Sequence, residues 1–157
     1  MNITLPPLDQ QARRVVHGRG HCVEGAESFN IEWLPPIMLI VAYSSLTEDQ
    51  LGALVELLSA EPLVEGIYLQ ERDQPKAPVR HIWGDEQCPS EIQEHGLRYH
   101  VDIGTHQNFG LFLDMANGRD WVRERAQGKH LLNLFSYTCG FAVAAMAGGA
   151  ASVVNLD

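Results

Sequence analysis

The chain has 157 residues, 45% of them hydrophobic and 20% charged, which is typical of one or two small globular domains. Twenty acidic residues outnumber 11 basic ones, and the net charge of −9 argues against a self-sufficient nucleic-acid binder. Only a local patch could bind RNA or DNA, and Arg13, Arg14 and Arg19 form the obvious candidate.

The beginning of the chain and its apolar runs carry no membrane or targeting signal. Residues 1–7 lack a basic stretch followed by an apolar one. The longest apolar run, residues 34–43, contains Pro35 and Pro36, so it favours a buried strand over a membrane span. We therefore expect a cytoplasmic protein with no membrane partner.

The cysteines and histidines predict neither a disulfide framework nor a metal site. No C-x-x-C spacing occurs among the three cysteines, Cys22, Cys88 and Cys139. His17 and His21 lie near Cys22, but four residues of a strand span about 13 Å, too far for one ion unless the chain bends there. Free thiols in a reducing compartment are the expected state.

In the first half of the chain, three segments have strand patterns. Residues 12–22 carry β-branched side chains between glycines and predict a strand or a bent hairpin. Residues 37–43 are apolar at consecutive positions, which is typical of a central strand buried on both faces. Residues 63–70 predict the next strand, and the proline-containing residues 74–78 a loop.

The clearest helix lies between the last two of these strands. Thr47 is a good N-cap with Gln50 three residues later, which is the pattern of a capping box. Leu46 and Leu51 stand where a hydrophobic staple would place them, and apolar residues then recur at helical spacing to about Ala60.

The second half begins with a hairpin pattern over residues 91–103. Alternating side chains flank His95 and Gly96, and the glycine can supply the positive φ that a tight turn needs. A connector over residues 104–113 then leads to a helix expected over residues 114–126.

The last residues form a βαβ pattern. Residues 130–135 predict a short apolar strand, 136–140 a turn of small residues, 141–149 an alanine-rich helix, and 151–156 a second buried strand. In open α/β sheets, ligands bind beyond the carboxyl ends of the strands, against such a turn. Asp157 ends the second strand, where a carboxylate can accept hydrogen bonds from ribose hydroxyls.

This pattern by itself does not decide the ligand. Many parallel sheets have such turns and bind nothing. A dinucleotide fold is the natural rival, but its G-x-G-x-x-G fingerprint is absent, because Gly140 is the only glycine in the turn. An adenosine ligand without a pyrophosphate is therefore favoured.

Two motifs together resemble a known family. Residues 108–114 (NFGLFLD) and 132–141 (LNLFSYTCGF) resemble the "TG-FLDQR-N" and "LDLFSYTGGF" segments of class I methyltransferases related to bacterial large-subunit ribosomal RNA methyltransferases I and K. Residues 94–99 resemble the preceding "ENGLRF" segment. The likeness is good over residues 91–157, and residues 13–36 look like a compact subgroup without a PUA domain.

The resemblance implies an α/β protein in two parts. An N-terminal α+β domain on the substrate side covers residues 1–107, and the first βαβ unit of an incomplete Rossmann-like methyltransferase sheet covers residues 108–157. The implied cofactor is S-adenosylmethionine. Position by position, its site would comprise Leu113, Asp114, Phe135, Ser136, Tyr137, Thr138, Gly140 and Asp157. No catalytic residue and no metal ligand is expected, because the family's nucleophile and its "DPP"-type companion lie beyond residue 157.

The chain departs from the family pattern at three positions. Asn133 replaces an aspartate and weakens any polar contact there, and Met115 stands where glutamine is usual. Cys139 replaces a glycine and adopts positive φ less readily; we interpret it as a packing residue and not as a nucleophile. His106 lies in the connector and is a further candidate for the site.

The leading hypothesis is therefore the N-terminal part of an S-adenosylmethionine-dependent methyltransferase, with ribosomal RNA as the substrate of the full protein. The isolated chain is expected to be inactive, to bind cofactor weakly and to expose apolar faces of an incomplete sheet. The alternative is a non-catalytic module for RNA binding or homodimer formation, built from residues 1 to about 110.

Overall fold

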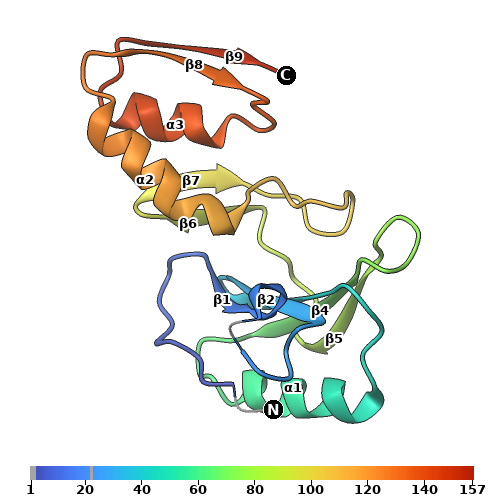
Figure 1. Ribbon diagram of the computed structural model, residues 1–157. Coiled ribbons are helices and arrows are strands. Elements are labelled where there is room, and N and C mark those ends of the chain that lie inside the picture. The colour runs from blue at the N-terminus through green and yellow to red at the C-terminus, as the bar shows by residue number, and fades with distance from the viewer. Residues whose placement is uncertain (1–2, 22) are drawn as a thin grey trace.

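A computed structural model describes residues 3–21 and 23–157, and shows two lobes joined by the segment after β5 (Figure 1). The N-terminal lobe contains a five-stranded sheet in the order β1-β2-β3-β4-β5. Neighbouring strands are antiparallel except for β3 and β4, which run parallel because helix α1 provides the crossover between them. The bounds are β1 Arg13–His17, β2 Phe29–Leu34, β3 Ile37–Ala42, α1 Glu48–Ser59, β4 Gly66–Glu71 and β5 Val79–Gly84.

Strand β3 is buried on both faces, as its apolar sequence predicts. Its residues Met38 and Ile40 pack with Leu54 and Leu58 of α1 on one face of the sheet. On the other face, Leu39 belongs to a second core cluster formed with the hairpin and connector of the next lobe. The central strand therefore belongs to both cores.

The capping box of α1 is confirmed. The Thr47 hydroxyl accepts a hydrogen bond from the Gln50 amide at 3.2 Å, and the Gln50 side chain accepts one from the Thr47 amide at 3.0 Å. Leu46 and Leu51 both pack against the core below the sheet. The local pattern thus set the beginning of this helix correctly.

The first strand confirms one of the two alternatives for residues 12–22, over a shorter range. Arg13–His17 forms a strand, but a single 3-10 turn, Gly18–Gly20, follows it in place of a hairpin. A Cβ on Gly18 would lie 1.7 Å from the Ala26 carbonyl oxygen, so this position accommodates only glycine. Strands β2 and β5 were not predicted. Cys22 lies outside the described residues, so the metal alternative at that cysteine is not described.

The C-terminal lobe contains the predicted hairpin and the predicted βαβ unit (Figure 1). In the hairpin turn, His95 and Gly96 both have positive φ, 50° and 77°. Strands β8 and β9 pair in parallel, with Leu132 opposite Val154. The bounds are β6 Glu91–Glu94, β7 Leu97–His100, α2 Ala116–Arg125, β8 His130–Leu134, α3 Gly140–Ala147 and β9 Ser152–Leu156, with a 3-10 turn, Leu113–Met115, ahead of α2.

The small β8–β9 sheet has one covered and one open face. Leu131 and Val153 pack towards Ala145 of α3. The opposite face consists of apolar side chains that are each more than half exposed: Leu132 61%, Leu134 54%, Val154 56% and Leu156 55%. The expectation of exposed apolar faces is therefore confirmed. Within the described part of the chain, no helix is long and apolar enough to cross a membrane.

Candidate functional site

The turn after β8 has an unusual backbone. Alternate residues Phe135, Tyr137 and Cys139 have φ values of 54°, 48° and 64°, in the left-handed region. That region costs an L-residue about 1–2 kcal/mol, so such a turn stores strain. Cys139 adopts it although its side chain makes it less suited than glycine, and it stands at the N-terminus of α3.

We expect Cys139→Gly to raise the free energy of unfolding by about 0.5–1 kcal/mol, the relief of left-handed strain less the entropy cost of glycine. Cys139→Ala keeps the Cβ atom and should leave the stability nearly unchanged. Urea denaturation of the two variants beside the unmodified chain measures the difference. Equal stability of the glycine and alanine variants would show that the backbone at Cys139 is not strained.

Hydrogen bonds hold this turn between β9 and the connector. The Tyr137 amide donates to Asp157 Oδ1 at 3.2 Å, and the Tyr137 hydroxyl donates to the Asn108 carbonyl at 3.3 Å. The Thr138 hydroxyl donates to the Gly110 carbonyl at 2.5 Å. The structure therefore brings Asp157 against the turn, in the arrangement that the sequence predicts.

Five of the eight candidate cofactor residues line one hollow of about 80 Å³. These are Phe135, Ser136, Tyr137, Thr138 and Gly140, and they face Leu111, Phe112, Met115, Arg119 and Phe141. A Cβ on Gly140 would lie 3.3 Å from Leu111 Cδ1, so this glycine also permits close packing beneath the turn. Phe135 is 92% exposed and presents its ring to solvent.

Arg119, which lines the hollow, forms a buried ion pair with Glu94. Arg119 Nε and Nη2 donate to the two Glu94 carboxylate oxygens at 2.7 and 2.6 Å, and both side chains are nearly inaccessible. Arg119 Nη2 also donates to the Phe112 carbonyl at 2.9 Å. One side chain of α2 therefore ties the hairpin to the connector below the turn.

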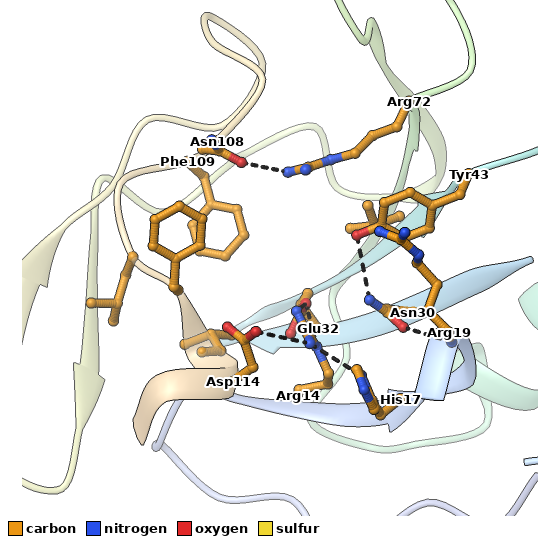
Figure 2. Close-up of a pocket in the computed structure, with 14 residues that line it drawn as sticks. Arg14, His17, Arg19, Asn30, Glu32, Tyr43, Arg72, Asn108, Phe109 and Asp114 are labelled. Atoms are coloured by element: carbon orange, nitrogen blue, oxygen red, sulfur yellow. Dashed lines mark hydrogen bonds and ion pairs between the residues drawn. The ribbon is translucent and has the colours of Figure 1, made fainter. Parts of the chain in front are cut away.

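Leu113 and Asp114 lie apart from this hollow. Both line a larger cavity of about 350 Å³ between the sheet of the N-terminal lobe and the connector (Figure 2). Leu113 is almost fully buried in the core, and Asp114 Oδ2 lies 3.6 Å from Arg14 Nη1. Their contact with a cofactor remains a prediction.

The larger cavity brings together polar residues that the sequence analysis did not connect. Glu32 is buried, and its Oε1 accepts from Arg14 Nε at 2.8 Å, while no residue in 3–21 or 23–157 bonds its buried Oε2. Burial raises the pKa of the Glu32 carboxyl, and Arg14 opposes the shift. The wall also contains His17, Arg19, Asn30, Tyr43, Arg72 and Asn108. A strand alternation over residues 29–34, with Asn30 and Glu32 on one face, was the available signal.

The remaining candidates do not converge on either cavity. His106 is exposed and lines none of the cavities described. Among the described residues, no group of three or more His, Cys, Asp or Glu side chains is arranged to hold a metal ion.

A parallel βαβ unit with a strained turn and an acidic residue at the end of its second strand is the arrangement at which open α/β sheets bind ligands. The profile of the S-adenosylmethionine-dependent methyltransferase family matches residues 13–157, and the chain belongs to that family. The family is S-adenosylmethionine-dependent, which confirms the cofactor that the resemblance implied.

Named relatives support the same family. The K/L-type ribosomal RNA large subunit methyltransferase of Hahella chejuensis is 31% identical over 81% of the chain and 19% of the relative. YwbD of Bacillus subtilis, provisionally named a ribosomal RNA large subunit methyltransferase, is 32% identical over 95% of the chain and 39% of its own length. The chain thus spans well under half the length of these relatives.

A solved structure has the same fold. SMU.776, provisionally named a methyltransferase and crystallised with SAH, superposes with a TM-score of 0.77 at 28% identity. The match covers 94% of this chain and 38% of that protein. The mixed α/β architecture is therefore that of S-adenosylmethionine-dependent methyltransferases.

Proposed function

We propose that this chain forms the RNA-facing lobe and the first part of the cofactor site of a methyltransferase that modifies ribosomal RNA. The observation that carries the proposal is the Asp157 carboxylate held beside the turn after β8. The names of relatives that span most of this chain support ribosomal RNA as the substrate. Such a substrate would be met in the cytoplasm, the location expected from the sequence.

The residues present fit the cofactor at one side. Asp157 uses Oδ1 for the Tyr137 amide, which leaves Oδ2 free of a described partner to accept from ribose hydroxyls. The small residues Ser136 and Thr138 let the backbone approach a ligand. When bound, S-adenosylmethionine supplies a methyl group on a sulfonium, and these residues would orient its adenosine end.

The size of the hollow supports weak binding by the isolated chain. At about 80 Å³ it is well below the ~300–1,000 Å³ typical of small-molecule sites. We therefore expect the chain by itself to provide one wall of a cofactor site and to bind the cofactor weakly.

Titration with S-adenosylmethionine tests this proposal. We expect calorimetry to show no saturation at micromolar cofactor, and NMR shift changes at high concentration confined to residues 135–140 and Asp157. Asp157→Asn should abolish those changes, and Asp49→Asn, on the exposed start of α1, should preserve them. A micromolar or tighter dissociation constant, or shifts located elsewhere, would contradict it.

A second proposal, homodimer formation, is supported by the open apolar face of β8 and β9. A second copy placed on Leu132, Leu134, Val154 and Leu156 would remove these side chains from water. Sedimentation equilibrium of the chain and of a Leu132→Lys variant tests this. A monomer at all concentrations would reject self-association.

A further inference from the structure

The 350 Å³ cavity lies between the sheet of the N-terminal lobe and the connector (Figure 2). Leu111 and Phe112 line both this cavity and the hollow of the turn. The Phe112 ring also contacts the Tyr137 ring, with centroids 5.2 Å apart. One connector therefore forms a common wall between a ligand-sized cavity and the cofactor side.

One end of the cavity is cationic and aromatic. The Arg19 guanidinium lies 4.2 Å from the Tyr43 ring centroid, and that of Arg72 lies 5.7 Å from it. Arg72 is fixed there by bonds to the Gln107 carbonyl and Asn108 Oδ1, both at 2.8 Å. A guanidinium group that is stacked on an aromatic ring or held by hydrogen bonds is preorganised to bind phosphate.

The Arg19 side chain has donors to spare. Its backbone amide donates to Asn30 Oδ1 at 3.3 Å, but within the described ranges no hydrogen bond or ion pair of its guanidinium is found. The cavity therefore contains a guanidinium group without an ion-pair partner among the described residues, although the chain has a net charge of −9. An anionic ligand is the natural partner for that charge.

Glu32, which also lines the cavity, offers an acceptor. Glu32 Oε2 is buried without a bond from any described residue, and a buried carboxylate oxygen without a donor is unfavourable. Arg14 holds Glu32 in place and also approaches Asp114. A ligand that presents N–H groups there would satisfy the unpaired oxygen.

We propose that the cavity binds one nucleotide of single-stranded RNA, with its phosphate on Arg19 and Arg72 and an amino-bearing base at Glu32. The cavity volume lies within the ~300–1,000 Å³ of small-molecule sites, and unpaired RNA bases are bound by stacking and by hydrogen bonds to their edges. This inference rests on the proposed RNA substrate and assigns the part of the chain that holds it.

Fluorescence anisotropy with a labelled single-stranded RNA of mixed sequence, at low salt, tests the assignment. We expect Arg19→Ala to weaken binding at least fivefold. Arg125→Ala removes the same charge from the exposed end of α2, away from the cavity, and should change binding less than twofold. Among unlabelled competitors, AMP, CMP and GMP should compete better than UMP.

The outcomes separate the two proposals. If RNA binds and both arginine variants weaken it equally, the cavity assignment fails while RNA binding by the lobe stands. If nucleoside monophosphates bind with the Arg19 dependence but RNA does not, the cavity is a nucleotide site and the RNA function fails. If neither ligand binds, or UMP competes equally, the inference is overturned. Circular dichroism of each variant checks that it is folded.

Discussion

Arg119→Ala is expected to lower the free energy of unfolding by about 3–5 kcal/mol, measured by urea denaturation. The substitution leaves the Glu94 carboxylate buried without its two charged hydrogen bonds, and it frees the Phe112 carbonyl. Since water does not reach this carboxylate, its desolvation is no longer compensated.

Two variants serve as controls for the ion pair. Arg98→Ala breaks an ion pair between exposed side chains, Arg98 at 70% and Glu91 at 51% exposure. This substitution should lower the free energy of unfolding by at most about 1 kcal/mol. Replacing Arg119 and Glu94 together by methionine should recover most of the loss, because no unpaired charge remains. If the double variant loses as much free energy of unfolding as Arg119→Ala, the loss in Arg119→Ala comes from packing and not from the unpaired carboxylate.

Leu39→Ala and Ile40→Ala are each expected to cost about 2–5 kcal/mol, although the two residues are consecutive. Leu39 belongs to the core beneath the hairpin, and Ile40 belongs to the core over α1. In an ordinary amphipathic strand, alanine substitution would lower stability strongly at only one of two neighbouring residues, because their side chains lie on opposite faces. Leu63→Ala, at an exposed position, should change stability by about 0.5 kcal/mol or less.

Urea denaturation of Leu39→Ala, Ile40→Ala and Leu63→Ala measures whether both faces of β3 contribute to stability. A small effect of Leu39→Ala beside a large effect of Ile40→Ala would mean that the hairpin and connector do not stabilise the sheet. The two lobes would then be energetically independent, with the boundary between them after β5 and not near residue 107.

Elements with a strong local signal were predicted well. The capping box defined the start of α1, uninterrupted apolar residues defined β3, and the His95–Gly96 turn defined the β6–β7 hairpin. Strand β5 escaped prediction because Arg80 and His81 interrupt its pattern and its side chains are only half-buried at the edge of the sheet.

The turn after β8 was predicted in its position but not in its conformation. Composition and order placed Asp157 at the end of a strand beside the turn, and the bond from the Tyr137 amide confirms that neighbourhood. Left-handed φ values at Phe135 and Cys139 could not be inferred, because neither residue type favours them. The surrounding hydrogen bonds, such as that of Thr138 to Gly110, hold this backbone in place.

The basic patch suggested by the sequence was only partly correct. Arg14 and Arg19 do line the larger cavity, but Arg13 pairs with Asp9 and lies outside it. Arg72, which completes the cationic end, follows β4 and comes from a distant part of the chain. Of the three arginines that line the cavity, proximity along the sequence therefore identified Arg14 and Arg19 but not Arg72.

Short-range patterns were enough to predict the βαβ unit, its turn and the acidic end of β9, because strand periodicity and small turn residues act over a few neighbouring positions. The positions of Leu113 and Asp114, and the meeting of Glu32, Arg72 and Asn108 in one cavity, depend on tertiary packing. Those residues meet because the connector packs over the sheet face opposite α1. Such long-range packing depends on the summed burial of both cores and leaves no pattern in any single segment.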